Sequence, residues 1–265
     1  MPYANNNGVK IYYEVEGEGP PLVLAHAIMS SLTDWRTFGY ADALKTDYRL
    51  VLFDARGRGR TDKPRQASAY EYSVLATDVL TVLDDLGIDR AHYLGYSMGA
   101  RVGFLLATRN AARFNSFILG GNTPYQIPVG TVKTMTDLIE GHKLLRADPE
   151  SYLQQMARRL GQPLTPEQRQ RYLAQDADTL IAMESAWLDS PSLKDHDLSR
   201  ISLPCLIYCG DIDQGGFHAA ALECVDHIPN ANFVSLAGCD HSTAMVRSHL
   251  ILPHIKEFLA RVSKK

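Results

Sequence analysis

A serine stands at the centre of a pattern that favours nucleophilic catalysis. The run Gly95-Tyr96-Ser97-Met98-Gly99 follows an apolar, strand-like stretch and precedes a segment with helical spacing. A serine at the apex of so tight a strand-to-helix turn has a strained backbone, and glycine two residues away on each side avoids steric collision. The backbone N–H of Met98 would lie at a helix N-terminus, where negative charge is favoured. The pattern predicts Ser97 as a nucleophile.

A serine hydroxyl is a weak nucleophile without a base, and one of nine histidines is well placed to act as one. His241 follows the strand-like run 232–236 and a glycine, so it would lie in a loop at the carboxyl end of the last strand. From there its imidazole could reach Ser97. Taken one at a time, the other histidines favour structural roles in loops, in helices or in the helical insertion (lid) described below, and His26 is considered again with the resemblance. They are His26, His92, His142, His196, His218, His227, His249 and His254.

An acid to orient the imidazole is expected in the preceding loop. The apolar run 205–210 leads into Asp211-Ile212-Asp213, again at the carboxyl end of a strand. Both aspartates are candidates. We favour Asp213 because it lies further along the loop, whereas Asp211 is placed to pin the turn. The chain order Ser97, Asp213, His241 differs from that of the two well-known serine protease folds.

Short apolar runs alternate with helix-length segments, which predicts a mostly parallel α/β sheet with helices on both faces. The runs are continuously apolar, as expected for strands buried on both faces. We predict strands at residues 22–25, 50–53, 92–96, 116–119, 206–209 and 233–236, with 9–15 as an edge or hairpin strand.

Helix signals fill the gaps between these strands. Ser68 and Glu71 could form a capping box ahead of an apolar stripe over 74–86, and Gly87 would end that helix. Strand signals disappear over residues 122–200, where Asp-Pro-Glu at 148–150 and Thr-Pro-Glu-Gln at 165–168 mark helix starts. We therefore expect a core domain made of residues 1–121 and 201–265, with 122–200 inserted as an all-helical cap.

Composition excludes several classes of partner. A net charge of −3 provides no basic field for nucleic acid or an anionic membrane. The first residues contain no apolar secretory segment, and no apolar run approaches the roughly 18 residues of a membrane span. The cysteines lack a CxxC spacing, which favours buried reduced thiols over a metal or disulfide role: Cys205, Cys209, Cys224 and Cys239. We expect a cytoplasmic protein that acts on a small molecule.

Taken together, these motifs resemble the α/β-hydrolase superfamily, in its branch of small capped esterases, enol-lactonases, C–C hydrolases and cofactor-free haloperoxidase-like enzymes. The resemblance covers residues 8–120 and 201–262, and the cap matches in position and length only. It rests on LAHAI at 24–28, DARGRGRT at 54–61, GYSMG at 95–99, and the loops GDID and GCDH that end at Asp213 and His241. It implies a sheet of about eight strands, and it matches Asp213 and His241 to the family's acid and base.

The resemblance also implies an oxyanion hole formed by the N–H groups of Met98 and Ile28, although Ala27 replaces the family's usual glycine. We expect His26, Tyr96 and Trp187 to contact substrate. No spacing of His, Cys and carboxylates indicates a metal, and no dinucleotide motif indicates a cofactor.

The predicted activity is hydrolysis of a small ester or lactone through an acyl-enzyme. The alternatives are a C–C bond or thioester hydrolase with the same three residues, and a non-catalytic ligand-binding protein of the same fold. The substrate and the oligomeric state are not readable from the sequence.

Overall fold

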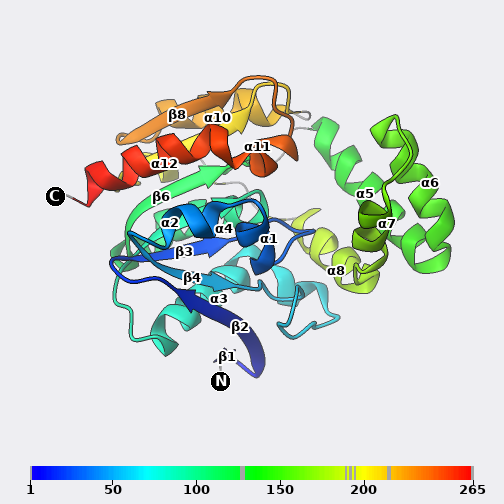
Figure 1. Ribbon diagram of the computed structural model, residues 1–265, viewed down its shortest axis with the longest axis horizontal. Coiled ribbons are helices and arrows are strands. Elements are labelled where there is room, and N and C mark those ends of the chain that lie inside the picture. Colours follow the sequence, from blue (N-terminus) through cyan, green and yellow to red (C-terminus); the bar gives the residue numbers. More distant parts are fainter. Residues whose placement is uncertain are drawn as a thin grey trace. The chain divides into compact units, whose positions relative to one another are not determined.

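The computed structural model describes residues 2–125, 129–188, 190, 193, 195–213 and 216–263. Over these ranges, eight strands form one sheet in the order β1-β2-β4-β3-β5-β6-β7-β8 (Figure 1). The strands are β1 (Tyr3–Asn6), β2 (Val9–Glu16), β3 (Pro21–Ala25), β4 (Arg49–Phe53), β5 (Ala91–Tyr96), β6 (Phe114–Gly120), β7 (Cys205–Gly210) and β8 (Ala231–Leu236). Neighbours from β4 to β8 run parallel, and β2 is antiparallel to both β1 and β4. The predicted fold class is confirmed.

The six apolar runs predicted as buried strands form β3 to β8, with slightly wider bounds. The strand at 9–15 forms β2, a hairpin strand that lies inside the sheet and not at its edge. The edge is β1, which the sequence analysis did not predict. Asn7 (φ 52°) and Gly8 (φ 89°) make the two-residue turn of this hairpin, and both have the left-handed backbone that such a turn requires.

Alternate residues of the central strands face different helices. One face, with Leu24, Leu52 and Leu94, packs in a core cluster against Trp35 and Phe258. These two residues lie on α1 (Leu32–Thr37) and α12 (Ser248–Val262); α2 (Tyr40–Leu44) and α11 (Thr243–Val246) also contribute to this cluster.

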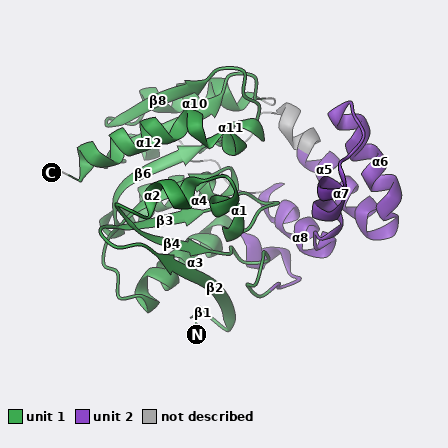
Figure 2. Cartoon of the chain, in the orientation of Figure 1, with its two compact units in different colours: residues 1–62, 72–126, 191–265 green, residues 63–71, 127–190 purple. Residues whose placement is uncertain are grey.

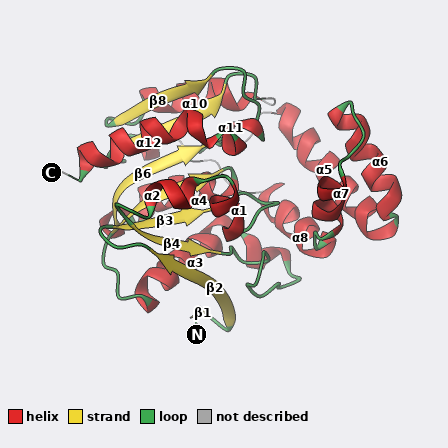
Figure 3. Cartoon of the chain, in the orientation of Figure 1, coloured by secondary structure: helices red, strands yellow, loops and turns green. Residues whose placement is uncertain are grey.

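The opposite face of the sheet lies against α3 (Tyr72–Asp85), α4 (Met98–Arg109) and α10 (Phe217–Asp226) (Figure 3). A Cβ at Gly103 would come within 2.4 Å of Leu119 and 2.6 Å of Tyr93. Gly103 lies on α4, so this helix approaches the sheet closely. The short 3-10 helix η2 (Ala111–Arg113) follows α4.

The start of α3 differs from the prediction. Ser68 lies inside a 3-10 helix, η1 (Ala67–Tyr70), and Glu71 is extended before α3 begins at Tyr72, so no capping box forms. The end of α3 is as expected, because Gly87 is left-handed (φ 64°) and the N–H of Ile88 reaches back to the carbonyl of Leu83.

The chain separates into two compact units, coloured in Figure 2. The first comprises residues 1–62, 72–126 and 191–265, and carries the whole sheet. The second comprises 63–71 and 127–190. The segment 63–71 therefore belongs to the helical unit by its contacts, although the sequence analysis assigned it to the core domain.

The helical unit is built from four helices and η1 within its described residues. They are α5 (Val129–Ala147), α6 (Pro149–Leu160), α7 (Pro166–Leu173) and α8 (Ala177–Leu188). Both predicted helix starts form as expected: Asp148 caps α6, and Thr165 makes a capping box with Gln168 at α7. A last short helix, α9 (Asp195–Leu198), precedes β7. None of the described helices has the length and apolar character needed to cross a membrane.

Candidate active site

Ser97 lies at the junction of β5 and α4 with a strained backbone (φ 52°, ψ −111°). Both flanking glycines are required by close backbone contacts. A Cβ at Gly95 would lie 2.5 Å from the carbonyl carbon of Gly99, and a Cβ at Gly99 would lie 2.1 Å from the carbonyl oxygen of Ala25. Neither glycine position therefore has room for a side chain. The contact of Gly99 with Ala25 also shows that α4 begins directly against the end of β3.

Three side chains from distant parts of the chain form one hydrogen-bonded series. His241 Nε2 lies 2.9 Å from Ser97 Oγ, and His241 Nδ1 lies 2.9 Å from Asp213 Oδ2. The Asp213 side chain is 1% exposed and that of His241 is 39% exposed, so the carboxylate is sealed from water and the imidazole is not. A δ-protonated imidazole would donate to Asp213 and leave Nε2 free to accept the serine proton.

Asp211 contacts a different group from Asp213. Its Oδ1 accepts a hydrogen bond from the backbone N–H of Gly238 at 2.7 Å, which ties the acid loop to the loop that carries His241. Asp211 is exposed and no interaction joins it to the imidazole. The structure therefore places Asp213, and not Asp211, beside His241.

The loop of His241 is fixed by further contacts. The Tyr96 hydroxyl donates to the backbone carbonyl of His241 at 2.6 Å. The rings of Tyr96 and Phe217 each lie 5.5 Å from the imidazole, centroid to centroid. Asp240 accepts from the N–H groups of Ser242 and Thr243 at 3.0 and 2.7 Å, which closes the turn after the histidine.

A thiol also contacts the buried carboxylate. Cys209 Sγ lies 3.5 Å from Asp213 Oδ2, the oxygen that faces His241. Burial raises the pKa of Cys209, with the charge of Asp213 adding to the shift, so the thiol stays protonated and donates. This contact was not predicted from the sequence. The only signal for it is the position of the cysteine four residues before the aspartate, at the end of an apolar run.

The two proposed oxyanion donors lie on adjoining segments. Met98 is the first residue of α4, so its N–H has no acceptor within that helix. Ile28 follows β3 inside a turn that the N–H of Ser30 closes onto the carbonyl of Ala27 at 3.2 Å, and this bond does not use the Ile28 N–H. Ala27 is accommodated in this turn.

Three residues expected to contact substrate have their polar atoms hydrogen-bonded within the protein. His26 is fully buried, its Nδ1 lies 2.7 Å from the carbonyl of Ala27, and its Nε2 accepts from the N–H of Ala55 at 3.0 Å. Burial lowers the pKa of His26, which keeps the ring neutral in this bridge. We therefore correct its assignment to a structural one, because neither ring nitrogen is available.

Tyr96 and Trp187 are also committed to backbone carbonyls. Tyr96 is 1% exposed and bonds to the His241 loop, as described above. The indole N–H of Trp187 donates to the carbonyl of Tyr70 at 2.9 Å, which holds η1 against α8 in the helical unit. Their polar atoms position protein segments, and contact of their rings with substrate stays a prediction.

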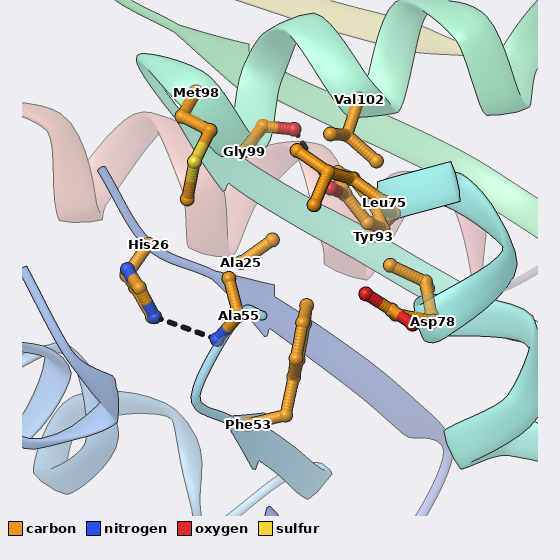
Figure 4. A pocket seen from close by; sticks show the side chains of 11 residues that line it. Ala25, His26, Phe53, Ala55, Leu75, Asp78, Tyr93, Met98, Gly99 and Val102 are labelled. Atoms are coloured by element: carbon orange, nitrogen blue, oxygen red, sulfur yellow. Dashed lines mark hydrogen bonds between the residues drawn. The ribbon is translucent and has the colours of Figure 1, made fainter. Parts of the chain in front are cut away.

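A pocket lies between the ends of β3 and β4 and the helices α3 and α4 (Figure 4). Its lining is mostly apolar, with His26 and Asp78 as the polar members. Met98 and Gly99 line it, but Ser97 and His241 do not, so it lies behind the serine turn and not at the reacting hydroxyl. Among the residues that the structure describes, no group of three or more His, Cys, Asp or Glu side chains could hold a metal ion.

The turn at 54–61 is structural. The carboxylate of Asp54 accepts from the N–H groups of Leu32 and Arg60, both at 2.9 Å. Thr61 Oγ1 donates to the Asp54 carbonyl at 2.6 Å and accepts from the Tyr12 N–H at 2.8 Å. These bonds hold the turn after β4 against β2 and the start of α1.

Comparison with known proteins identifies the family to which the fold belongs. A family model described as alpha/beta hydrolase fold matches residues 20–248. A Bacillus subtilis (strain 168) protein, provisionally named 2-succinyl-6-hydroxy-2,4-cyclohexadiene-1-carboxylate synthase, is 25% identical over 97% of this chain and 97% of its own length.

Two solved structures are similar along the whole chain. A thermophilic esterase from Thermogutta terrifontis has a TM-score of 0.80 and 21% identity, covering 99% of this chain and 97% of its own. An enol-lactonase from Burkholderia xenovorans LB400 has a TM-score of 0.76 and 23% identity, covering 98% of this chain and 100% of its own. At these identities the likeness shows the fold.

Proposed function

Because the chain belongs to the alpha/beta hydrolase family, we propose that it is a serine hydrolase that cleaves a small carboxylic ester or lactone through an acyl-enzyme. The observation that carries the proposal is the hydrogen-bonded series from Ser97 through His241 to Asp213, with both distances at 2.9 Å. A serine, an imidazole and a buried carboxylate in this order are the parts that acyl transfer needs.

Each residue has a defined role in the proposed reaction. Ser97 Oγ attacks the acyl carbonyl while His241 Nε2 takes its proton, and Asp213 stabilises the imidazolium that forms. The N–H groups of Met98 and Ile28 hold the oxyanion. His241 then returns the proton to the leaving alcohol, and a water activated by the same imidazole releases the acid.

The proposal that the cleaved bond is an ester or lactone rests on proteins of similar fold. The esterase and the enol-lactonase cover nearly the whole chain, and both of their names specify ester or lactone chemistry. A Ser97 nucleophile in place of an aspartate argues against dehalogenase or epoxide hydrolase chemistry on this fold. The resemblance described above includes C–C hydrolases, so carbon–carbon substrates belong in any activity screen.

A fluorophosphonate probe tests the proposal directly. The wild-type protein should be labelled at Ser97, and Ser97→Ala should abolish both labelling and the turnover of p-nitrophenyl esters, the latter by roughly 10⁶-fold. The matched control is Ser235→Ala. Ser235 Oγ also lies 2.8 Å from a histidine nitrogen, on His218, but that pair is exposed. The control variant should label normally.

Two results would contradict the proposal. Absence of labelling in the wild-type protein would favour a non-catalytic, ligand-binding role. Labelling without turnover of any ester or lactone, across acyl chains of graded length, would move the activity to thioesters or carbon–carbon bonds.

We also propose that the protein works in the cytoplasm. Its four cysteines are buried and free, and burial raises the pKa of Cys205 to about 12, so these thiols are stable in a reducing compartment. Protein purified without reductant should react with an aromatic disulfide reagent at four thiols in guanidinium chloride and at almost none when native. Fewer than four in the denatured protein would indicate a disulfide and a different compartment.

A further inference from the structure

The backbone carbonyl of Ser97 is held by a side chain from another segment. Asn122 Nδ2 donates to this carbonyl oxygen at 3.0 Å, and the N–H of Arg101 donates to it from the first turn of α4, also at 3.0 Å. The bond from the Arg101 N–H is the ordinary bond between residues i and i−4 of an α-helix. The bond from Asn122, which lies two residues after β6, is an addition.

Asn122 is itself held in one orientation. Its Oδ1 accepts from the N–H of Thr123 at 2.8 Å, which leaves the amide NH₂ directed at Ser97. The preceding Gly121 is left-handed (φ 64°), and a Cβ there would lie 2.6 Å from the Tyr96 ring. Its N–H donates to the carbonyl of Tyr208 at 2.9 Å.

The next residues are anchored by α4. The Arg101 guanidinium is buried and donates from one nitrogen to the carbonyls of Thr123 and Tyr125, at 2.6 and 2.8 Å. The segment 121–125 is therefore fixed to the serine turn at several points, and Asn122 has little freedom to move away.

The carbonyl that Asn122 holds belongs to the same peptide group as the N–H of Met98. A trans peptide is planar, and its C=O and N–H point in opposite directions. Fixing the oxygen of Ser97 therefore fixes the direction in which the Met98 N–H points. A hydrogen bond to the oxygen also polarises the peptide and strengthens its N–H as a donor.

We propose that Asn122 is a positioning residue for the oxyanion hole: its amide orients and polarises the Ser97–Met98 peptide so that the Met98 N–H stabilises the developing negative charge. The inference rests on the proposed function, since it assumes that an oxyanion forms at Ser97. Asn122 acts through the peptide and does not touch the reacting atoms.

Two substitutions isolate the donor. Asn122→Asp keeps the shape but replaces the NH₂ with an oxygen that repels the carbonyl, and Asn122→Ala removes the side chain. Removing an oxyanion donor outright lowers kcat by roughly 10²–10³-fold. Because Asn122 only orients such a donor, both variants should lower kcat on the order of tenfold, with KM changed less than about twofold.

A transition-state analogue separates this role from a general structural one. A trifluoromethyl ketone adds to Ser97 Oγ: the O–C bond forms, the carbonyl becomes an alkoxide in the oxyanion hole, and the serine proton moves to His241. Its inhibition constant should rise by the same factor as kcat falls, whereas the constant for a product carboxylic acid should stay within twofold. The pH at which activity is half-maximal on the acid side should not move in Asn122→Ala, because the contacts of His241 are intact.

The matched control is Asn230→Ala. Asn230 Nδ2 also donates to a backbone carbonyl, that of Ser202 at 2.8 Å, but on the exposed surface before β8. This variant should behave as wild type in every assay. Thermal unfolding of all variants checks that the fold is retained.

The outcomes are distinguishable. If wild type hydrolyses esters and Asn122→Ala and Asn122→Asp keep wild-type kcat and ketone inhibition, the role of Asn122 is wrong and the proposed function stands. The role of Asn122 is also wrong if the inhibition constants of the ketone and of the product acid rise by the same factor, because equal losses indicate a distorted site. If wild type neither hydrolyses esters nor binds the ketone, both proposals fall.

Discussion

Two carboxylates, Asp211 and Asp213, lie in one loop after β7 yet hold different parts of the site. The Asp213 side chain is buried and faces His241 Nδ1, whereas Asp211 is exposed and accepts from the N–H of Gly238. A carboxylate sealed from water beside an imidazole nitrogen can hold the imidazole in one orientation and one tautomer. The exposed one adds a single hydrogen bond between two loops.

These contacts predict unequal effects on catalysis. Asp213→Asn should lower kcat by roughly 10⁴-fold, because an amide can impose the wrong imidazole tautomer and cannot balance its charge. Asp211→Asn keeps an oxygen that can accept from Gly238, so kcat should fall less than about tenfold. Steady-state hydrolysis of one p-nitrophenyl ester by both variants provides the comparison. A nearly silent Asp213→Asn beside a crippled Asp211→Asn would reverse the assignment of the acid.

At this scale, the sequence predicts which loops carry polar groups, but not how each side chain is used. Ser97, Asp213 and His241 each follow a strand of a parallel sheet, and the carboxyl ends of such strands share one edge, so their proximity was inferable. The contacts of Cys209 and Asn122 depend on strand register and on rotamers, which leave no trace in spacing. The predicted substrate contact of His26 is wrong for a similar reason, because its bond to Ala55 appears only in three dimensions.

At the scale of elements, hydrophobic pattern and capping chemistry predicted most of what forms. Continuous apolar runs became β3 to β8, and the proline-led starts became α6 and α7. Each of these signals is local: a cap satisfies N–H groups of its own helix, and a buried strand needs only apolar residues.

Elements that depend on distant partners were predicted less well. The segment at Ser68 satisfies a capping-box pattern but forms η1, because Tyr70 is held from two sides: its hydroxyl donates to the Pro64 carbonyl, and its carbonyl accepts from Trp187. The short, mixed sequence of β1 becomes a strand because β2 offers it a free edge across the Asn7-Gly8 turn. Neither partner can be located from local sequence alone.

At the scale of the whole molecule, the proposed chemistry belongs to one unit. Ser97, His241 and Asp213 all lie in the unit that carries the sheet, together with Asn122 and the two oxyanion candidates. The stability of that unit therefore sets the conditions under which the site exists, and its buried ionisable groups determine how that stability varies with pH.

The histidine of the central strand β5 should make the protein sensitive to acid. His92 is 3% exposed, and its Nδ1 lies 2.8 Å from Ser116 Oγ on β6. Burial lowers the pKa of His92 from 6.5 to about 4. In the unfolded chain the ring takes up a proton first as the pH falls, so folding loses stability between about pH 6.5 and 4. The loss approaches about 3 kcal/mol at the lower limit, a large part of the 5–15 kcal/mol typical of a native protein.

Substituting His92 with a side chain that does not titrate should remove this acid-dependent loss of stability. His92→Asn retains a polar group near Ser116, so its free energy of unfolding should fall less steeply with acid than that of wild type, by about 3 kcal/mol in total between pH 7 and 4. Urea unfolding at half-unit pH steps measures the difference, and His254→Asn, at an exposed position on α12, should follow wild type throughout. Parallel curves for wild type and His92→Asn would show that the buried ring takes up its proton without opposing the fold, and the acid sensitivity would then have to arise elsewhere.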